Sequence, residues 1–167
     1  MEKRTVGIVG GGQLGRMMAE AAHRIGVKVA VLDPLGANSP AGQLVAPGLA
    51  VEGACMLAGS SQKKTLDLAA LVDIMTVEIE HVDTDVLEAV ERSGTPVQPT
   101  PKTIRMIQDK LRQKEHLAKF DIALPDFMDV PDLDSLSAVA EAFGYPFMLK
   151  SRTGVSSVSY PSLSMSS

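Results

Sequence analysis

A glycine-rich loop is the first feature of the sequence with the residues and spacing to do chemistry. The apolar run Thr5–Val9 leads directly into it, and Gly10, Gly12 and Gly15 have the G-x-G-x-x-G spacing. Backbone amides at such a strand-to-helix turn point outward at a helix N-terminus, where a partial positive charge favours anions. Glycine also lets a ligand approach the backbone closely. The spacing indicates a site for a dinucleotide such as NAD or for another anionic ligand, although a tight turn with a structural role has the same pattern.

Three acidic residues stand at the ends of two predicted strands. Asp33 lies eighteen residues after Gly15, where an NAD domain carries its ribose-binding acid; a polar strand end that caps the next loop is the alternative. Glu78 and Glu80 end a later apolar run, beyond which ligands bind in open α/β sheets. Two carboxylates there would repel a pyrophosphate and suit an amine or hydroxyls, or they form a solvated strand end. His81 has no second His or Cys at ligand spacing, so we expect no metal site.

Two lysines in the second half of the chain are candidates for binding phosphate. Lys150 follows the apolar residues PFML, and an ammonium group on a buried strand is costly unless it meets an anion. A lysine on an edge strand that reaches water is the alternative. Lys110 lies in a helix dense with charge, which by itself indicates a solvated face.

The elements that position these residues predict an α/β fold with a parallel, doubly wound sheet. Residues 5–33 read as strand, glycine loop, helix and strand, with Gly26 ending the helix. We expect that helix to bury an apolar stripe made of Leu14, Met17, Met18, Ala21, Ala22 and Ile25. Further helices are expected at 66–72, 83–91, 101–120 and 133–143, and strands at 74–79, 96–98, around Phe127 and at 146–151. A short helix or loop and one weak strand are expected within 41–59.

The chain divides into three segments by composition and punctuation. A domain boundary is predicted near residues 99–103, where Thr100 and Pro101 form a good helix start. The last fourteen residues, from Gly154 onward, contain seven serines and no charge. Such a segment buries too little apolar surface to order itself, so we expect it to be disordered.

The composition excludes several classes of protein. The 167 residues are 45% hydrophobic and 22% charged, which fits a soluble globular protein. A net charge of −4 argues against electrostatic binding to nucleic acid or to an anionic membrane. The single Cys55 cannot form an internal disulfide, and no apolar run approaches the roughly 20 residues that span a bilayer. We expect a cytoplasmic protein.

Four stretches together resemble a known family. They are GIVGGGQLGRMMAEAAHRIGVKVAVLDP, DIMTVEIEHVDTDVLEAVERSGTPVQPTP, IQDKLRQKEHLAKFDIALPDF and FGYPFMLKSRTG. Over residues 5–154 they resemble N5-carboxyaminoimidazole ribonucleotide synthetase of purine biosynthesis, and particularly the fungal form, the N-terminal part of phosphoribosylaminoimidazole carboxylase. The combination of GQLGRM with VEIEHVD is specific. The resemblance implies a Rossmann-like pre-ATP-grasp domain in residues 1–100 and the first part of an ATP-grasp domain in residues 101–153.

The resemblance also implies an activity and a site. Enzymes of this family use ATP, Mg²⁺ and bicarbonate to form carboxyphosphate, then carboxylate the amine of aminoimidazole ribonucleotide and release ADP and phosphate. A homodimer is the family expectation. By position, the resemblance assigns the aminoimidazole ribonucleotide site to Gly12, Gln13, Leu14 and Glu78, and the ATP phosphates to Lys110 and Lys150.

The sequence departs from the family after Thr153. The family continues into a loop resembling AYDGRGN that covers the ATP phosphates, whereas here the serine-rich residues 154–167 follow. The acids that bind Mg²⁺ in the family have no counterpart, so catalytic residues stay unassigned, and we expect an N-terminal fragment that is inactive alone. The alternative function is an NAD-dependent oxidoreductase or a dinucleotide-binding module. A third is a non-catalytic fragment that associates with the full-length enzyme.

Overall fold

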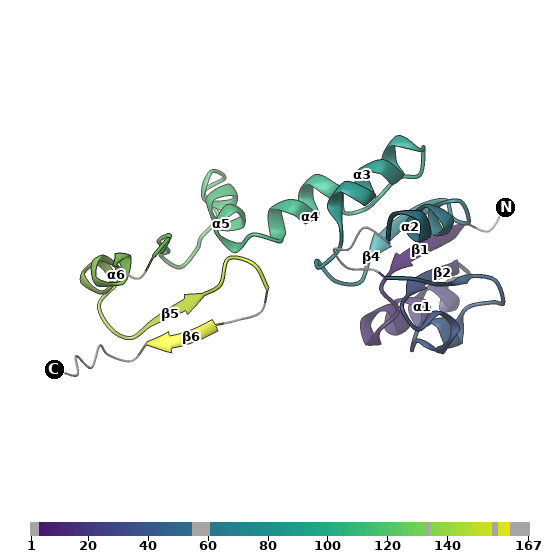
Figure 1. The fold of residues 1–167 in the computed structure, drawn as a ribbon, viewed down its shortest axis with the longest axis horizontal. Helices are drawn as coiled ribbons and strands as arrows, with labels where there is room; N and C mark the ends of the chain where they lie inside the picture. Colours follow the sequence, from purple (N-terminus) through teal and green to yellow (C-terminus); the bar gives the residue numbers. More distant parts are fainter. Residues whose placement is uncertain (1–3, 55–60, 133, 155–156, 161–167) are drawn as a thin grey trace. The chain divides into compact units, whose positions relative to one another are not determined.

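The computed structural model describes residues 4–54, 61–132, 134–154 and 157–160. They form two compact units that divide between Arg105 and Met106, a few residues beyond the boundary predicted near 99–103. Cys55 and most of the serine-rich segment lie outside the described residues. Figure 1 shows the elements of both units along the chain.

The first unit contains the predicted parallel sheet. Its strand order is β3-β2-β1-β4, and every neighbouring pair is parallel. Val97 adds an isolated parallel bridge to Met75 at the edge of β4, where a short strand is expected. The strands are β1 (Thr5–Val9), β2 (Lys28–Asp33), β3 (Ala50–Glu52) and β4 (Ile74–Val77); the connecting elements are α1 (Gln13–Arg24), the 3₁₀ turns η1 (Gly36–Asn38) and η2 (Gly42–Leu44), α2 (Ser61–Ala69), α3 (Thr84–Arg92) and α4 (Pro101–Ile107).

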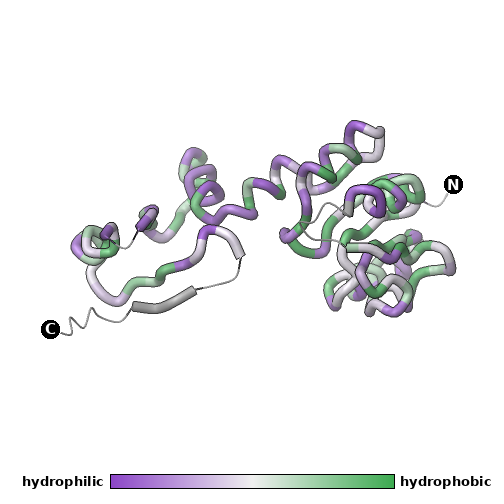
Figure 2. The backbone as a smooth tube through the Cα atoms, in the orientation of Figure 1, coloured by the Kyte–Doolittle hydropathy of each residue, from purple (hydrophilic) through white to green (hydrophobic). Residues whose placement is uncertain are grey.

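Helices cover both faces of this sheet and give it two hydrophobic cores. Successive strand residues point to opposite faces. Ile8 and Val31 therefore pack with Ala19 of α1 on one face, while Val9 and Leu32 pack with buried residues of α2, α3 and α4 on the other. The strands are accordingly apolar along most of their length (Figure 2). This three-layer α/β arrangement confirms the predicted fold class.

Helix α1 buries only part of the apolar stripe predicted for it, since Met18 and Ala22 pack against the core. Its fully buried residues are Gly15 and Ala19. Three large apolar side chains are exposed instead: Leu14 (51%), Met17 (55%) and Ile25 (76%). A Cβ at Gly15 would lie 2.7 Å from the carbonyl oxygen of Gly10. The helix therefore lies so close to the glycine loop that small residues face the sheet, and part of the apolar stripe faces solvent.

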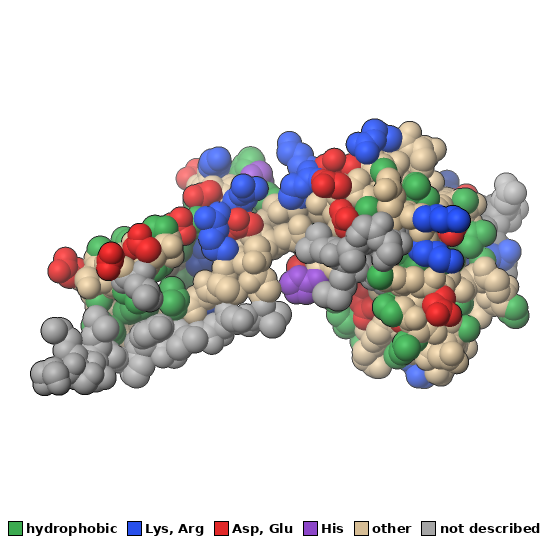
Figure 3. Space-filling model, viewed as in Figure 1, with side chains coloured by type: hydrophobic (Ala, Val, Ile, Leu, Met, Phe, Trp, Pro, Cys, Tyr) green, Lys and Arg blue, Asp and Glu red, His purple; other side chains and the backbone are tan. Residues whose placement is uncertain are grey.

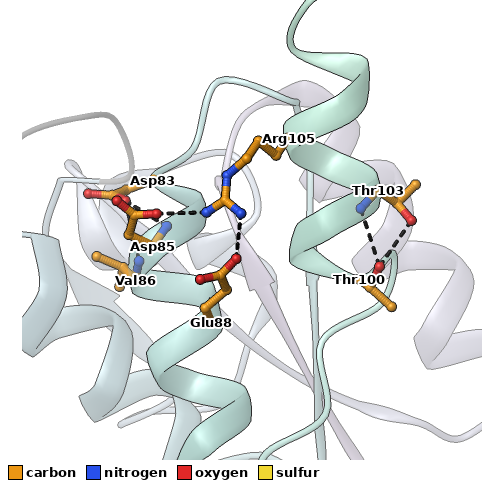
Figure 4. Close-up of polar contacts among 7 residues, drawn as sticks. All are labelled: Asp83, Asp85, Val86, Glu88, Thr100, Thr103 and Arg105. Carbon is orange, nitrogen blue, oxygen red and sulfur yellow. Dashed lines mark hydrogen bonds and ion pairs between the residues drawn. The ribbon is translucent and has the colours of Figure 1, made fainter. Parts of the chain in front are cut away.

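Helix α4 is held to the first unit by packing and by charge. Ile104 is fully buried in the core shared with α2 and α3. Beside it, Arg105 donates from Nη2 to Asp85 Oδ1 at 2.6 Å and from Nη1 to Glu88 Oε1 at 2.5 Å, both on α3 (Figure 4). The hydrogen bond from Arg105 lowers the pKa of Glu88. At the start of α4, the hydroxyl of Thr100 accepts from the Thr103 amide at 3.3 Å, as an N-cap does.

The described residues of the second unit form two helices and one β-hairpin. They are α5 (Lys110–Ala118), α6 (Ser135–Phe143), β5 (Phe147–Lys150) and β6 (Ser157–Tyr160), with β5 and β6 antiparallel. The helix expected over 101–120 is in fact α4 and α5, because Asp109 leaves the helical conformation and caps a new helix through the Leu111 and Arg112 amides. The strand expected around Phe127 is absent, since residues 122–131 form neither helix nor strand.

Part of the serine-rich segment, Ser157–Tyr160, forms the strand β6. These residues pair with β5 in the register Lys150↔Ser157 to Phe147↔Tyr160. A ladder of backbone hydrogen bonds needs no apolar side chains, so low hydrophobicity did not prevent a strand from forming beside an existing one. Residues 155–156 and 161–167 lie outside the described residues.

Both units carry acidic and basic side chains on the face that Figure 3 shows. Within the described ranges, no helix has the length and apolar character needed to cross a membrane.

Candidate functional site

The carboxyl ends of three neighbouring strands meet around the glycine loop. Gly10 follows β1, Asp33 ends β2 and Glu78 follows β4. The hydrogen-bond ladder continues past the strand ends, because Gly10 N donates to Leu32 O and Glu78 N donates to Val9 O, each at 2.9 Å. The sheet therefore brings together the glycine loop and two of the acidic residues that the sequence indicates.

Glu78 caps the N-terminus of α1 from the neighbouring strand. Its Oε2 accepts from the Gly12 amide at 2.8 Å, and its Oε1 accepts from the Leu14 amide at 3.0 Å. Gly12 is the N-cap residue and has no side chain to satisfy these amides, which a helix otherwise leaves without partners. The anion at the helix N-terminus is thus a carboxylate of the chain itself.

The glycine spacing makes room for this carboxylate. A Cβ at Gly10 would lie 2.7 Å from Glu78 Oε2, and a Cβ at Gly12 would lie 2.7 Å from Glu78 Oε1. Both separations are shorter than the contacts that a real Cβ atom makes with its neighbours. Gly10 also has a φ of +105°, which favours glycine. The close approach that the spacing predicts is therefore made, in this structure, by Glu78.

Asp33 holds the same loop from the other side. Its Oδ2 accepts from the Gly11 amide at 2.9 Å, and its Oδ1 accepts from the Leu35 amide at 2.9 Å. The second contact caps the loop after β2, which is the structural role that the sequence allows beside ribose binding. Both of its oxygens are engaged by the backbone.

The remaining residues predicted at this end of the sheet lie around the loop. Gln13 and Leu14 are exposed in the first turn of α1, while Gly12 and Glu78 are half-buried. The strand expected at 74–79 ends at Val77, so the alternation that would direct Glu78 and Glu80 to one side does not extend to them. Glu80 Oε1 lies 3.6 Å from His81 Nε2.

The two candidate phosphate-binding lysines lie in the second unit. Lys110 is the first residue of α5, and Lys150 is the last residue of β5. Lys110 Nζ donates to the carbonyl oxygen of Gly154, and the Lys110 amide donates to Arg152 O at 2.9 Å. Lys150 is exposed. Its ammonium group is therefore not buried, contrary to what the apolar residues before it suggest.

An ion pair between Asp109 and Arg152 lies close in sequence to both lysines. Asp109, directly before Lys110, pairs with Arg152 at 2.7 Å, and this hydrogen bond lowers the pKa of Asp109. The sequence reasoning missed this pair and the capping role of Glu78, because each joins residues far apart in the chain. Within the part of the chain that the structure describes, no group of three or more His, Cys, Asp or Glu side chains is placed to hold a metal ion.

Comparisons with known proteins agree with this architecture. The protein-family model described as the ribonucleotide synthetase preATP-grasp domain matches residues 3–108. A phosphoribosylaminoimidazole carboxylase of Schizosaccharomyces pombe is 47% identical over 152 residues, which are 91% of this chain and 26% of that protein. The chain therefore spans about a quarter of the length of this curated relative.

Two solved structures from Aspergillus clavatus are similar along nearly the whole chain. Its carboxyaminoimidazole ribonucleotide synthase in complex with ATP is 40% identical, with a TM-score of 0.80 over 96% of this chain and 42% of that chain. The N5-carboxyaminoimidazole synthase in complex with ADP and 5-aminoimidazole ribonucleotide is 42% identical, with a TM-score of 0.79 over 90% of this chain and 39% of that chain. These similarities confirm the resemblance seen in the sequence. The chain belongs to the family of the ribonucleotide synthetase preATP-grasp domain.

Proposed function

We propose that this chain supplies the ribonucleotide-binding domain, and the first part of the ATP-grasp domain, of an enzyme of purine biosynthesis that carboxylates 5-aminoimidazole ribonucleotide. ATP would convert bicarbonate into carboxyphosphate, which carboxylates the amine of the ribonucleotide. The observation that carries the proposal is the similarity, over 90% of the chain, to a synthase solved with ADP and 5-aminoimidazole ribonucleotide. We assign residues 1–100 to the first domain and residues 101–153 to the ATP-grasp domain.

The ribonucleotide site is proposed to lie at the glycine loop, with Gly12, Gln13, Leu14 and Glu78 as its residues. Each oxygen of the Glu78 carboxylate accepts one backbone amide and keeps a second lone pair. Glu78 is thereby fixed in position while its negative charge stays available to a donor on the ligand. Such a charge suits the amine of an aminoimidazole. The exposed side chains of Gln13 and Leu14 lie in the first helical turn beside it.

The ATP phosphates are assigned to Lys110 and Lys150. Both lysines lie at the ends of regular elements, and the hydrogen bonds of Lys110 tie it to the segment that follows Lys150. An ammonium group is a compact charge with three donors, which suits phosphate oxygens. We propose that Mg²⁺ accompanies the ATP, although no described residue is assigned as its ligand.

Three further features of the proposal extend beyond the site. Bicarbonate is the carbon source, and a homodimer is the assembly, by analogy with the family. The protein is placed in the cytoplasm, because a single cysteine in 167 residues offers no internal disulfide and suits a reducing compartment.

The geometry of the loop disfavours the NAD alternative. The amides that would bind a pyrophosphate already donate to Glu78 and Asp33. A dinucleotide would have to displace Glu78 and would then lie beside its unpaired negative charge, which is unfavourable at short range. The acid that would bind the ribose, Asp33, is engaged by two backbone amides.

A calorimetric titration of the 167-residue chain tests the proposal. We expect saturable binding of 5-aminoimidazole ribonucleotide, a clear loss of that binding in Glu78→Ala, and no heat from NADH at the same concentrations. Glu80→Ala is the matched control, since it removes the same charge two residues away, where the carboxylate lies near His81. Micromolar binding of NADH without a response to the ribonucleotide would refute the proposal in favour of a dinucleotide-binding module.

A further inference from the structure

An ion-pair network joins the start of α5 to the loop that follows β5. Three kinds of contact cross between the two segments. Asp109 pairs with Arg152 through side chains, the Lys110 amide donates to the Arg152 carbonyl, and the Lys110 ammonium donates to the Gly154 carbonyl. More than 40 residues of chain separate the partners, so these contacts are a tertiary link and not a local turn.

Asp109 performs two tasks in this network with one carboxylate. Its Oδ1 accepts from the amides of Leu111 and Arg112 at 3.0 and 3.2 Å and so caps α5. Its Oδ2 accepts from Arg152 Nη2 at 2.7 Å, while Arg152 Nε lies 3.3 Å from Oδ1. This is a two-pronged contact, the geometry that gives arginine pairs their directional precision. The Asp109 side chain is only 16% exposed, which limits screening by solvent.

The guanidinium group of Arg152 is occupied by carboxylates. Nε and Nη2 face Asp109, and Nη1 lies 3.6 Å from Asp129 Oδ2. A group so neutralised has little attraction left for a phosphate. The ion pairs of the Arg152 side chain instead hold the Arg152 backbone in place. The Arg152 carbonyl, two residues after Lys150, accepts the hydrogen bond from the Lys110 amide.

We propose that Arg152 and Asp109 are positioning residues that set the separation of the two phosphate-binding lysines. Their pairing places the start of α5, and with it Lys110, against the end of β5, where Lys150 lies. This inference rests on the proposed function, because it assigns the network a role in binding ATP. Arg152 acts through the lysines and does not itself contact the phosphates.

Substitutions of the network test the inference without removing either lysine. Asp109→Asn keeps a good helix cap and loses the charge, while Arg152→Lys keeps the charge and loses the fork. Arg112→Gln is the matched control: the Nε of Arg112 lies 3.7 Å from Asp109 Oδ2, but its side chain is 65% exposed and belongs to α5 itself. All four proteins are full 167-residue chains.

The first measurement is amide hydrogen exchange of the ligand-free chains. We expect exchange at the Lys110 amide to accelerate about tenfold or more in Asp109→Asn and Arg152→Lys, and to stay unchanged in Arg112→Gln, because local opening governs exchange. Equal protection of the Lys110 amide in all four chains would overturn the inference.

The second measurement is the affinity for MgATP and for adenosine, which lacks the phosphates. The two network variants should bind MgATP about five- to twentyfold more weakly, a coupling of the size seen between residues of one network, with adenosine affinity unchanged. An equal loss of affinity for MgATP and for adenosine would indicate a purely structural role and would overturn the inference. Faster exchange at the Lys110 amide with unaltered MgATP affinity would also overturn it. Both results leave the proposed function intact. If the unsubstituted chain binds no MgATP, the proposed ATP site fails, and the inference fails with it.

Discussion

Removing the Glu78 carboxylate is expected to destabilise the first unit substantially. Glu78→Ala deletes the acceptor of two backbone amides, at 2.8 and 3.0 Å, at the N-terminus of α1. A hydrogen bond to a charged group contributes about 1.5–3 kcal/mol, and a negative charge at a helix N-terminus adds about 0.3–1 kcal/mol. Because water can reach the half-buried site and partly replace the carboxylate, we expect a loss of about 2–4 kcal/mol in the free energy of unfolding.

Glu78→Gln separates the hydrogen bonds from the charge. Its amide oxygen can still accept one of the two N–H groups, but its NH₂ group opposes the other. We therefore expect roughly half the loss of Glu78→Ala, about 1–2 kcal/mol. Urea unfolding followed by circular dichroism measures both variants, and Glu80→Ala is the control, with an expected change within about 0.5 kcal/mol.

An added anion gives a second, independent readout. In Glu78→Ala the two amides are free to bind sulfate, as helix N-termini commonly do. Sulfate should therefore stabilise Glu78→Ala more than it stabilises the original chain or Glu80→Ala. The capping role of Glu78 is refuted if Glu78→Ala unfolds within about 0.5 kcal/mol of the original chain and sulfate stabilises the original chain, Glu78→Ala and Glu80→Ala equally.

Three other perturbations test separate parts of the structure. Gly15→Ala should lower the free energy of unfolding by about 1–3 kcal/mol, because the new Cβ would lie 2.7 Å from the Gly10 carbonyl oxygen. Helix propensity alone would instead favour alanine by roughly 1 kcal/mol, so a variant that is more stable in urea unfolding would contradict the close approach. The hydrogen bond from Arg152 holds the pKa of Asp109 below its ordinary value, so its stabilisation is present above the unfolded-state pKa and is lost as the pH falls through the lowered one. The stability difference between the original chain and Asp109→Asn should thus be constant near neutrality and shrink below about pH 4; a difference that does not change on acidification would exclude this role. Arg105→Gln should lower the thermal midpoint slightly at low salt and hardly at all at about 1 M NaCl, since exposed ion pairs are screened, and an equal loss at both salt concentrations would point to packing instead.

The sequence predicted the first βαβ unit well because its signals are local. The apolar run Thr5–Val9, the glycines and the stop at Gly26 specify β1, the loop and the end of α1 without information from the rest of the chain. The same reasoning was only partly right for the orientation of α1, because Met18 and Ala22 pack against the core while Leu14, Met17 and Ile25 are exposed. Periodicity shows that one face is apolar, but only the close approach at Gly15 shows that the small residues face the sheet.

The chemistry at the loop was harder to predict for the same reason. The spacing indicates that something anionic approaches the glycines, and Glu78 was a candidate residue at the right end of the sheet. That Glu78 is itself the anion depends on the pairing of β1 with β4, a contact between residues more than 60 positions apart. The strand β6 also depends on a tertiary partner, because it forms by pairing with β5.

We propose that the glycine loop, with Glu78 as its built-in anion, receives 5-aminoimidazole ribonucleotide and not a dinucleotide. The most direct measurement follows the backbone amide resonances of Gly12 and Leu14 by NMR during titrations with each ligand. We expect saturable shifts of both resonances with 5-aminoimidazole ribonucleotide and none with NADH. Shifts of the same two resonances with NADH, and no response to the ribonucleotide, would contradict it.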